Sequence, residues 1–263
     1  MRVRFYTAPG REVRFEVVFR PPTLELTETV PATSLPPAPL TVGMVLFPGV
    51  TQLDLTGPYE VLARMPGTHI RLVASTLEPV RSEWGMTIVP DATFADAPPI
   101  DILCVPGGWG VNARLEDEEL LAFLRERGER ARYVTSVCSG ALLLGAAGLL
   151  RGYRATTHWL SLDLLAFFGA EAVEQRVVHD RNRITGAGVS AGIDFGLVLA
   201  AELFGADVAQ AIQLAIEYHP APPFDSGSPH TAPQEVRHAV ARASATALVQ
   251  RQAIVEGAAL RMR

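Results

Sequence analysis

From Thr41 onward, short apolar runs rich in β-branched residues alternate with stretches that have helical apolar spacing. "TVGMVLF" at 41–47 precedes the helix-like "LDLTGPYEVLARM" at 53–65. The same order returns where "DILCVPGG" at 101–108 precedes the amphipathic "EDEELLAFLRERGER" at 116–130. Strands that alternate with helices predict an α/β fold, with a mainly parallel sheet covered by helices on both faces and its site at the carboxyl ends of the strands.

The remaining segments extend this pattern toward the C-terminus. Strands are predicted at 69–75, in a pair around Gly85, at 132–137, at 153–158, at 172–180 and at 183–188. Helices are predicted from about Ser139, at 161–169, at 190–205, at 207–218 and within 231–263.

Residues 1–40 differ from the rest of the chain. A short alternating run, "VRFEVVF", suggests a strand, and the high proline content between Pro31 and Pro39 argues against regular structure there. We therefore expect an N-terminal extension and Pro-rich linker at 1–40, followed by an α/β domain with a C-terminal helix at 41–263. Two interpretations of the extension stay open: a mobile tail, or a start codon assigned too far upstream.

Composition narrows the range of partners. The formal net charge of −5 leaves no basic face dense enough for nucleic acid. The two cysteines lack the spacing of a disulfide framework or a zinc site, which favours a reducing cytoplasm. No run reaches the roughly 18 apolar residues of a membrane span, and the first residues do not resemble a signal peptide. We expect a soluble, cytoplasmic protein.

Cys138 lies where an apolar run, "RYVTSV", gives way to the small residues of a predicted helix. A strand, a sharp turn and a helix form a nucleophile elbow, and the N-terminus of the helix would lower the pKa of the thiol. The alternative is a buried thiol that packs like a small hydrophobe. Cys104, inside the apolar "DILCV", has no helix start beside it and is expected to be structural.

Three further segments supply candidate partners for this thiol. Gly107 and Gly108 follow a predicted strand, where their backbone N–H groups could turn toward developing charge, although glycine pairs are also common as plain turns. Asp54 follows the first strand of the domain and, on local grounds, is better explained as a helix N-cap. His158 ends the predicted strand at 153–158, where packing beside a tryptophan is the default explanation.

Taken together, the blocks "QLDLTGPYEVLA", "DILCVPGG", "ARYVTSVCSGALLLGAAGLLRGYRATTHW" and "SAGIDFGLVLAAELFG" resemble the ThiJ/PfpI branch of the class I glutamine-amidotransferase-like superfamily. The resemblance implies a flavodoxin-like α/β sandwich, commonly a homodimer, without a metal or an organic cofactor. It implies a nucleophilic Cys138, an essential Asp54, backbone N–H groups of Gly108 and Ser139 near the nucleophile, and His158 in or beside the pocket.

Within that branch the sequence is most similar to bacterial isonitrile hydratases, which implies cysteine-dependent hydration of isonitriles to N-substituted formamides through a thioimidate. Ser139 stands where those enzymes have threonine; serine keeps the hydroxyl but loses the methyl group that restricts its rotamer.

Other activities of the superfamily remain as alternatives: a ligand or redox sensor, as in AraC-like regulators, or a glyoxalase or deglycase. Residues after about Thr231 predict one long helix without a pair of helix-turn-helix units, which speaks against a regulator.

Overall fold

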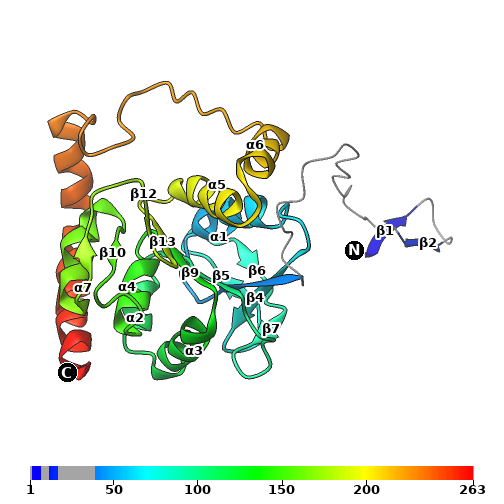
Figure 1. The fold of residues 1–263 in the computed structure, drawn as a ribbon, viewed down its shortest axis with the longest axis horizontal. Helices are drawn as coiled ribbons and strands as arrows, with labels where there is room; N and C mark the ends of the chain where they lie inside the picture. The colour runs from blue at the N-terminus through cyan, green and yellow to red at the C-terminus, as the bar shows by residue number, and fades with distance from the viewer. Residues whose placement is uncertain (1, 7–11, 17–38, 263) are drawn as a thin grey trace. The chain divides into compact units, whose positions relative to one another are not determined.

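A computed structural model describes residues 2–6, 12–16 and 39–262, and its main domain is built on a seven-stranded sheet with strand order β12-β13-β9-β8-β3-β4-β7 (Figure 1). The strands are β3 (Leu40–Val45), β4 (Thr68–Ala74), β7 (Ala92–Thr93), β8 (Ile102–Val105), β9 (Tyr133–Val137), β12 (Val177–Asp180) and β13 (Arg183–Gly186). All neighbouring strands are parallel except the antiparallel pair β12 and β13. The predicted, mainly parallel sheet is confirmed.

The two strands at the centre of the sheet are almost wholly buried. All four residues of β8 are inaccessible, and in β9 only Tyr133 reaches the surface in part. The Thr135 hydroxyl donates a 3.0 Å hydrogen bond to the carbonyl of Leu103, so this buried polar side chain in β9 is satisfied. Coverage on both faces explains why β8 reads as a continuous apolar run rather than as an alternating one.

The helices form two layers around this sheet. They are α1 (Gln52–Leu62), α2 (Val111–Arg114), α3 (Glu118–Arg130), α4 (Gly140–Ala146), α5 (Ala191–Phe204), α6 (Ala206–Ala215), α7 (Gln234–Arg261) and the 3₁₀ helix η1 (Trp159–Phe168). α1, α5 and α6 pack together, and α2, α3, α4, η1 and α7 form the other group (Figure 1). The flavodoxin-like sandwich expected from the resemblance is confirmed.

The structure refines the sequence interpretation in two places. The predicted strand at 153–158 shrinks to β10 (Arg154–Ala155), which pairs with β11 (Glu171–Ala172) outside the main sheet. The residues after β10 bond elsewhere: the Thr156 N–H donates to the Thr185 hydroxyl, and the Thr157 hydroxyl donates to the carbonyl of Cys138. The helix predicted at 161–169 is wound as a 3₁₀ helix.

A hairpin forms around Gly85, as the sequence predicted. Its strands β5 (Val80–Arg81) and β6 (Thr87–Ile88) are antiparallel. β7, which extends the sheet beyond β4, was not expected. Glu83, at the tip of this hairpin, lines a pocket together with Cys138.

The N-terminal residues belong to a separate unit, residues 1–34, while the domain described above belongs to residues 35–263. The first unit contains the antiparallel strands β1 (Arg2–Tyr6) and β2 (Glu12–Glu16), the second of which coincides with the start of the predicted strand. The Pro-rich segment lies outside the described residues as far as residue 38. The division at residue 40 into extension and domain therefore stays a prediction.

Candidate active site

Cys138 occupies a sharp turn between β9 and α4. Its φ angle is 54°, a left-handed conformation that a residue with a side chain adopts only under constraint. Two hydrogen bonds supply that constraint: the Cys138 N–H donates to the Gly186 carbonyl at 3.0 Å, and the Cys138 carbonyl accepts from the Thr157 hydroxyl at 2.6 Å. The predicted strand, turn and helix are present, and the turn fixes the position of the thiol.

The helix after the turn starts in direct contact with β8. A Cβ atom at Gly140 would overlap the carbonyl oxygen of Val105, so only glycine allows α4 to begin this close to the neighbouring strand. This approach places Cys138 beside the glycine turn that follows β8.

Asp54 is the third residue of α1 and is fully buried. The N-cap of α1 is Thr51, so the interpretation of Asp54 as an N-cap was wrong. Its carboxylate Oδ2 instead accepts a 3.0 Å hydrogen bond from the Gly107 N–H. The other oxygen, Oδ1, is buried and has no hydrogen-bond partner among the described residues. A carboxylate oxygen in that state is free to receive a proton.

The electrostatics of the site couple Asp54 with Cys138. Burial raises the pKa of Asp54 to about 7, against the opposing effects of the Gly107 hydrogen bond and of the Cys138 thiol. Burial, followed by the negative charge of Asp54, raises the pKa of Cys138 well above its ordinary value. The lowered pKa expected from the helix N-terminus was therefore wrong. Near neutral pH the resting state is a thiol beside a carboxyl group that titrates, and the two behave as a coupled pair.

The glycine turn after β8 holds the two groups beside it. The Gly107 N–H binds Asp54, and the Gly108 N–H donates to the Ser139 hydroxyl at 3.1 Å. The Ser139 hydroxyl in turn donates to the Gly108 carbonyl at 3.2 Å. Both N–H groups are thus occupied in this structure, and their role toward developing negative charge stays a prediction. The same two bonds fix the Ser139 rotamer without the methyl group of a threonine.

His158 lies at the N-cap of η1, where its Nδ1 accepts a 3.3 Å hydrogen bond from the Leu160 N–H. Burial, assisted by the charge of Arg251, lowers the pKa of His158 to about 4. The imidazole is therefore neutral at physiological pH, and with Nδ1 as the acceptor its proton resides on Nε2. His158 can donate a hydrogen bond but cannot supply a positive charge.

A cavity of about 170 Å³ adjoins these residues and brings Cys138, Ser139 and His158 to a common wall. Gly108 lines it as well, whereas Gly107 and Asp54 are not among the residues that line it. Trp109 also lines the cavity, and Trp159 is not among its lining residues.

Sequence reasoning missed part of this cavity. Glu83 from the β5–β6 hairpin lines it, as do four residues of α7: Val240, Ser244, Leu248 and Arg251. Their spacing places them along one face of a helix, a signal visible in the sequence. The sequence alone did not reveal that this face covers a cysteine more than a hundred residues earlier.

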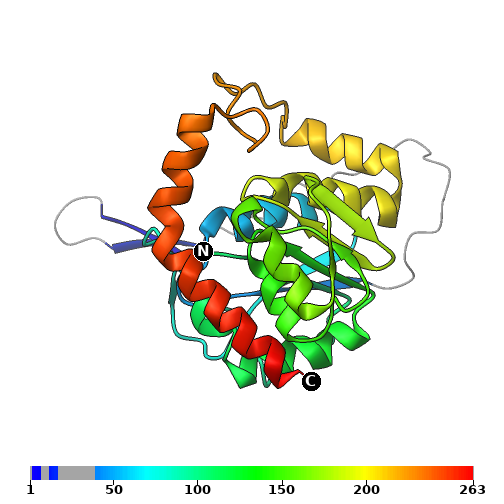
Figure 2. The same cartoon turned by 90° about the vertical axis from the view of Figure 1, so that its left-hand side faces the viewer.

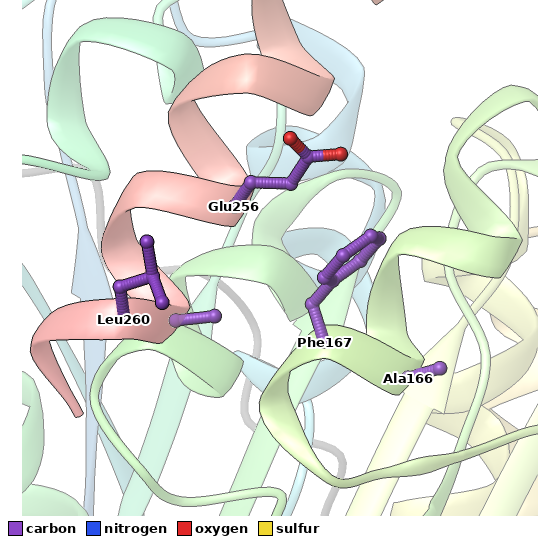
Figure 3. Close-up of a pocket in the computed structure, with 5 residues that line it drawn as sticks. Ala166, Phe167, Glu256 and Leu260 are labelled. Carbon is purple, nitrogen blue, oxygen red and sulfur yellow. The ribbon is translucent and has the colours of Figure 1, made fainter. Parts of the chain in front are cut away.

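A second groove, of about 490 Å³, lies between η1 and α7 (Figure 3). It is lined by Ala166, Phe167, Glu256, Ala259 and Leu260, and Figure 3 shows the Phe167 ring and the Glu256 carboxylate on its opposite sides. It contains no nucleophile, so the cavity at Cys138 is the candidate active site.

Within the described parts of the chain, no group of three or more His, Cys, Asp or Glu residues is arranged to hold a metal ion. Among the described helices, none is both long and apolar enough to cross a bilayer.

The chain is similar to a known protein family and to several characterised relatives. Residues 41–202 match the DJ-1/PfpI family. An isonitrile hydratase of Pseudomonas putida is 54% identical over 223 residues, which are 85% of this chain and 98% of that protein. A crystal structure of a ThiJ/PfpI family protein from Pseudomonas syringae superimposes with a TM-score of 0.82 at 48% identity, covering 85% of this chain and 94% of that chain. An HTH-type transcriptional regulator of Pseudomonas aeruginosa is 31% identical over 70% of this chain but only 53% of its own length.

The buried carboxyl of Asp54 predicts a stability effect that depends on pH. Because its pKa is higher in the folded state than in the unfolded chain, the folded state binds more protons between about pH 4 and pH 7, and stability falls as pH rises through that window. Asp54→Asn removes this penalty, which is on the order of 4 kcal/mol at about 1.4 kcal/mol per pKa unit. We expect the variant to be more stable than the parent at pH 8 and to lose that advantage toward pH 4.

Urea unfolding of both proteins at a series of pH values measures this difference. Asp163→Asn, at an exposed carboxylate of η1, is the matched control and should differ little from the parent at any pH. An Asp54→Asn advantage that is absent at pH 8 would contradict the raised pKa.

Proposed function

Because the chain belongs to the DJ-1/PfpI family, we propose that it is an enzyme that hydrates isonitriles to N-substituted formamides, with Cys138 as its nucleophile. The observation that carries this proposal is the buried Asp54 beside a thiol held at an elbow, with an Oδ1 that no described residue hydrogen-bonds. The identity to a hydratase of that name over 98% of its length supports the choice of substrate.

The first step forms a carbon–sulfur bond. The Cys138 thiol transfers its proton to the carboxylate of Asp54, and the resulting thiolate adds to the terminal carbon of R–N≡C. Asp54 returns the proton to that carbon, giving the thioimidate Cys–S–CH=N–R. No atom is lost in this step, and Asp54 ends as a carboxylate, able to act as a base in the next one.

The second step consumes water. The Asp54 carboxylate removes a proton from a water molecule, whose oxygen adds to the thioimidate carbon while the nitrogen is protonated. The carbon–sulfur bond of this tetrahedral intermediate then breaks, the sulfur leaves as a thiolate, and R–NH–CHO is released. One hydrogen of water ends on nitrogen. The other replaces the thiol proton that was transferred to carbon in the first step, which returns Cys138 and Asp54 to their starting state. Neither step calls on a metal or an organic cofactor.

The cavity favours a compact, apolar R group. Its volume of about 170 Å³ suits a small substituent, and Leu160, Val189, Val240 and Leu248 contribute apolar walls. The Ser139 hydroxyl, fixed by Gly108, is available to orient water or to relay a proton. We expect small alkyl and aryl isonitriles to be better substrates than charged ones.

A sensor function is less well supported. Oxidation requires a thiolate, whereas burial keeps Cys138 as a thiol in the resting protein. The regulator to which this chain is similar is nearly twice as long as the matched segment, and α7 here lines the pocket as one continuous helix. A ligand-sensing role would show as binding of an isonitrile without its consumption.

We also propose that the protein is a cytoplasmic homodimer, as the resemblance implies. Several apolar side chains on and near α6 and α7 are exposed in the single chain, with Leu214 at 81%, Phe224 at 76% and Val249 at 70% exposure. Apolar surface of this kind is common where two copies of a chain associate.

Loss of the isonitrile stretch in the infrared spectrum tests the function directly. Wild-type protein should remove the band as a formamide appears, and Cys138→Ala should abolish this loss because no nucleophile remains. Cys104→Ala makes the same chemical change at a thiol buried in β8, whose pKa burial raises to about 12, and it should retain turnover. Methylglyoxal is tested in parallel. Its Cys138-dependent consumption without loss of the isonitrile band would instead favour the glyoxalase alternative.

The pH dependence of kcat/KM tests the role of Asp54. Below a pH of about 7 both Asp54 and Cys138 are protonated, so the base that takes the thiol proton is absent and kcat/KM should fall. We expect kcat/KM to rise as pH increases through about 7. In Asp54→Asn the rate should drop about 10²–10⁴-fold and the rise should disappear.

The exposed-site control Asp163→Asn should keep both the rate and the pH profile of the parent. A parent kcat/KM that is highest below pH 5 would rule out Asp54 as the base.

A further inference from the structure

Arg251 from α7 is buried beside the active-site cavity although its side chain is among the most polar in the protein. Only 4% of its surface is exposed, and it shares the cavity wall with Cys138. Figures 1 and 2 show α7, coloured orange to red, running along one side of the domain, where it contacts η1, α4 and α2. A helix from the C-terminal end of the chain thus brings a cation to the nucleophile.

All the described residues that hydrogen-bond to the guanidinium do so through neutral groups. Its Nε donates to Asn112 Oδ1 at 2.7 Å, its Nη1 to the Ser161 hydroxyl at 3.0 Å, and its Nη2 to the Gly108 carbonyl at 3.5 Å. The guanidinium also lies 5.1 Å from the centre of the Trp109 ring. These contacts fix the orientation of the group without neutralising its charge.

No ion pair formed within the described residues includes Arg251. Glu83 lines the same cavity and its charge acts on Arg251, but its carboxylate is hydrogen-bonded elsewhere. It accepts from the Thr51 hydroxyl at 2.8 Å and from the Trp109 N–H at 3.2 Å. An arginine side chain does not deprotonate in a protein, so this is a permanent buried charge. A buried charge without a counter-ion is costly, which is tolerated most readily where an anion arrives during function.

We propose that the guanidinium of Arg251 is the counter-charge for the thiolate of Cys138, so that α7 completes the active site. When the thiol proton moves to the Asp54 carboxylate, one negative charge passes from Asp54 to sulfur and the number of protons is unchanged. Arg251 then stabilises the sulfur anion. Its hydrogen bond to the Gly108 carbonyl also helps to hold the glycine turn whose N–H groups bind Asp54 and Ser139. It acts through these groups and is a positioning residue.

The inference rests on Cys138 being the nucleophile of the proposed function but not on the identity of the substrate. It concerns a part of the chain outside the segment that matches the family model, because that segment ends at residue 202 and α7 begins at Gln234. The titratable and charged groups that surround Cys138 are Asp54 on α1, Glu83 in the β5–β6 hairpin, His158 before η1 and Arg251 itself.

Alkylation of Cys138 by iodoacetamide, followed across pH by peptide mass spectrometry, tests the proposal without any isonitrile. Arg251→Gln and Arg251→Met remove the charge, and each should raise the apparent thiol pKa by about one unit, which slows alkylation at neutral pH roughly tenfold. Arg251→Lys keeps the charge and should recover part of that rate. Arg261→Gln, at an exposed arginine of the same helix paired with Glu116, should alkylate like the parent.

A further variant tests the charge without removing the side chain. Asn112→Asp places a carboxylate at the Nε of Arg251, where it would neutralise the guanidinium and should slow alkylation as Arg251→Gln does. This variant tests whether the charge of Arg251 promotes alkylation of Cys138, even if the neutral substitutions at Arg251 do not fold.

Two results would overturn the proposal: parent-like alkylation profiles in Asn112→Asp and in the folded neutral variants, or Arg251→Lys as slow as Arg251→Gln. If the parent protein hydrates no isonitrile, the alkylation profiles still distinguish failure of the proposed function from failure of this inference.

Discussion

The structure depends on one buried pair of acids, the Asp54 carboxyl and the Cys138 thiol, which cannot both ionise in the same small volume. Burial raises the pKa of both groups, and the negative charge of Asp54 raises that of Cys138 further, whereas the hydrogen bond from the Cys138 thiol lowers that of Asp54. Above a pH of about 7 the pair therefore holds one proton, on sulfur, and can pass it to the carboxylate oxygen. The neighbouring elements serve this arrangement: Gly107 fixes the carboxylate, the elbow fixes the sulfur, and Arg251 brings the charge that the sulfur anion needs.

Relative magnitudes explain why the thiol is not acidified by the helix that follows it. α4 has only seven residues, and a helix N-terminus contributes about 0.3–1 kcal/mol to a nearby anion. Full burial shifts a pKa by up to about 3–5 units, and each unit is worth about 1.4 kcal/mol. Burial therefore outweighs the helix by several-fold. Activation must come from Asp54 as a base and from a fixed positive charge. The thiol is therefore protonated and unreactive until its proton passes to the Asp54 carboxylate.

Much of the fold could be predicted from the pattern of the sequence, because buried parallel strands must be apolar and crossover helices must be amphipathic. The elbow at Cys138 followed from the junction of β9 with α4, and the hairpin around Gly85 from two short β-runs. Contacts made through space could not be predicted in this way. The N-cap interpretation of Asp54 failed because a local rule ignored the N–H of Gly107, and 153–158 was assigned as a strand because its hydrogen-bond partners, Cys138 and Thr185, are distant in sequence. Arg251 was missed for the same reason.

Mass spectrometry of the protein, quenched rapidly while it turns over an isonitrile, tests the central claim most directly. The account predicts a mass gain equal to one intact isonitrile molecule on the peptide that carries Cys138, because the thioimidate retains every atom of the substrate. No such gain is expected on the peptide with Cys104. Continued formamide production by protein whose Cys138 has been fully alkylated would contradict the account.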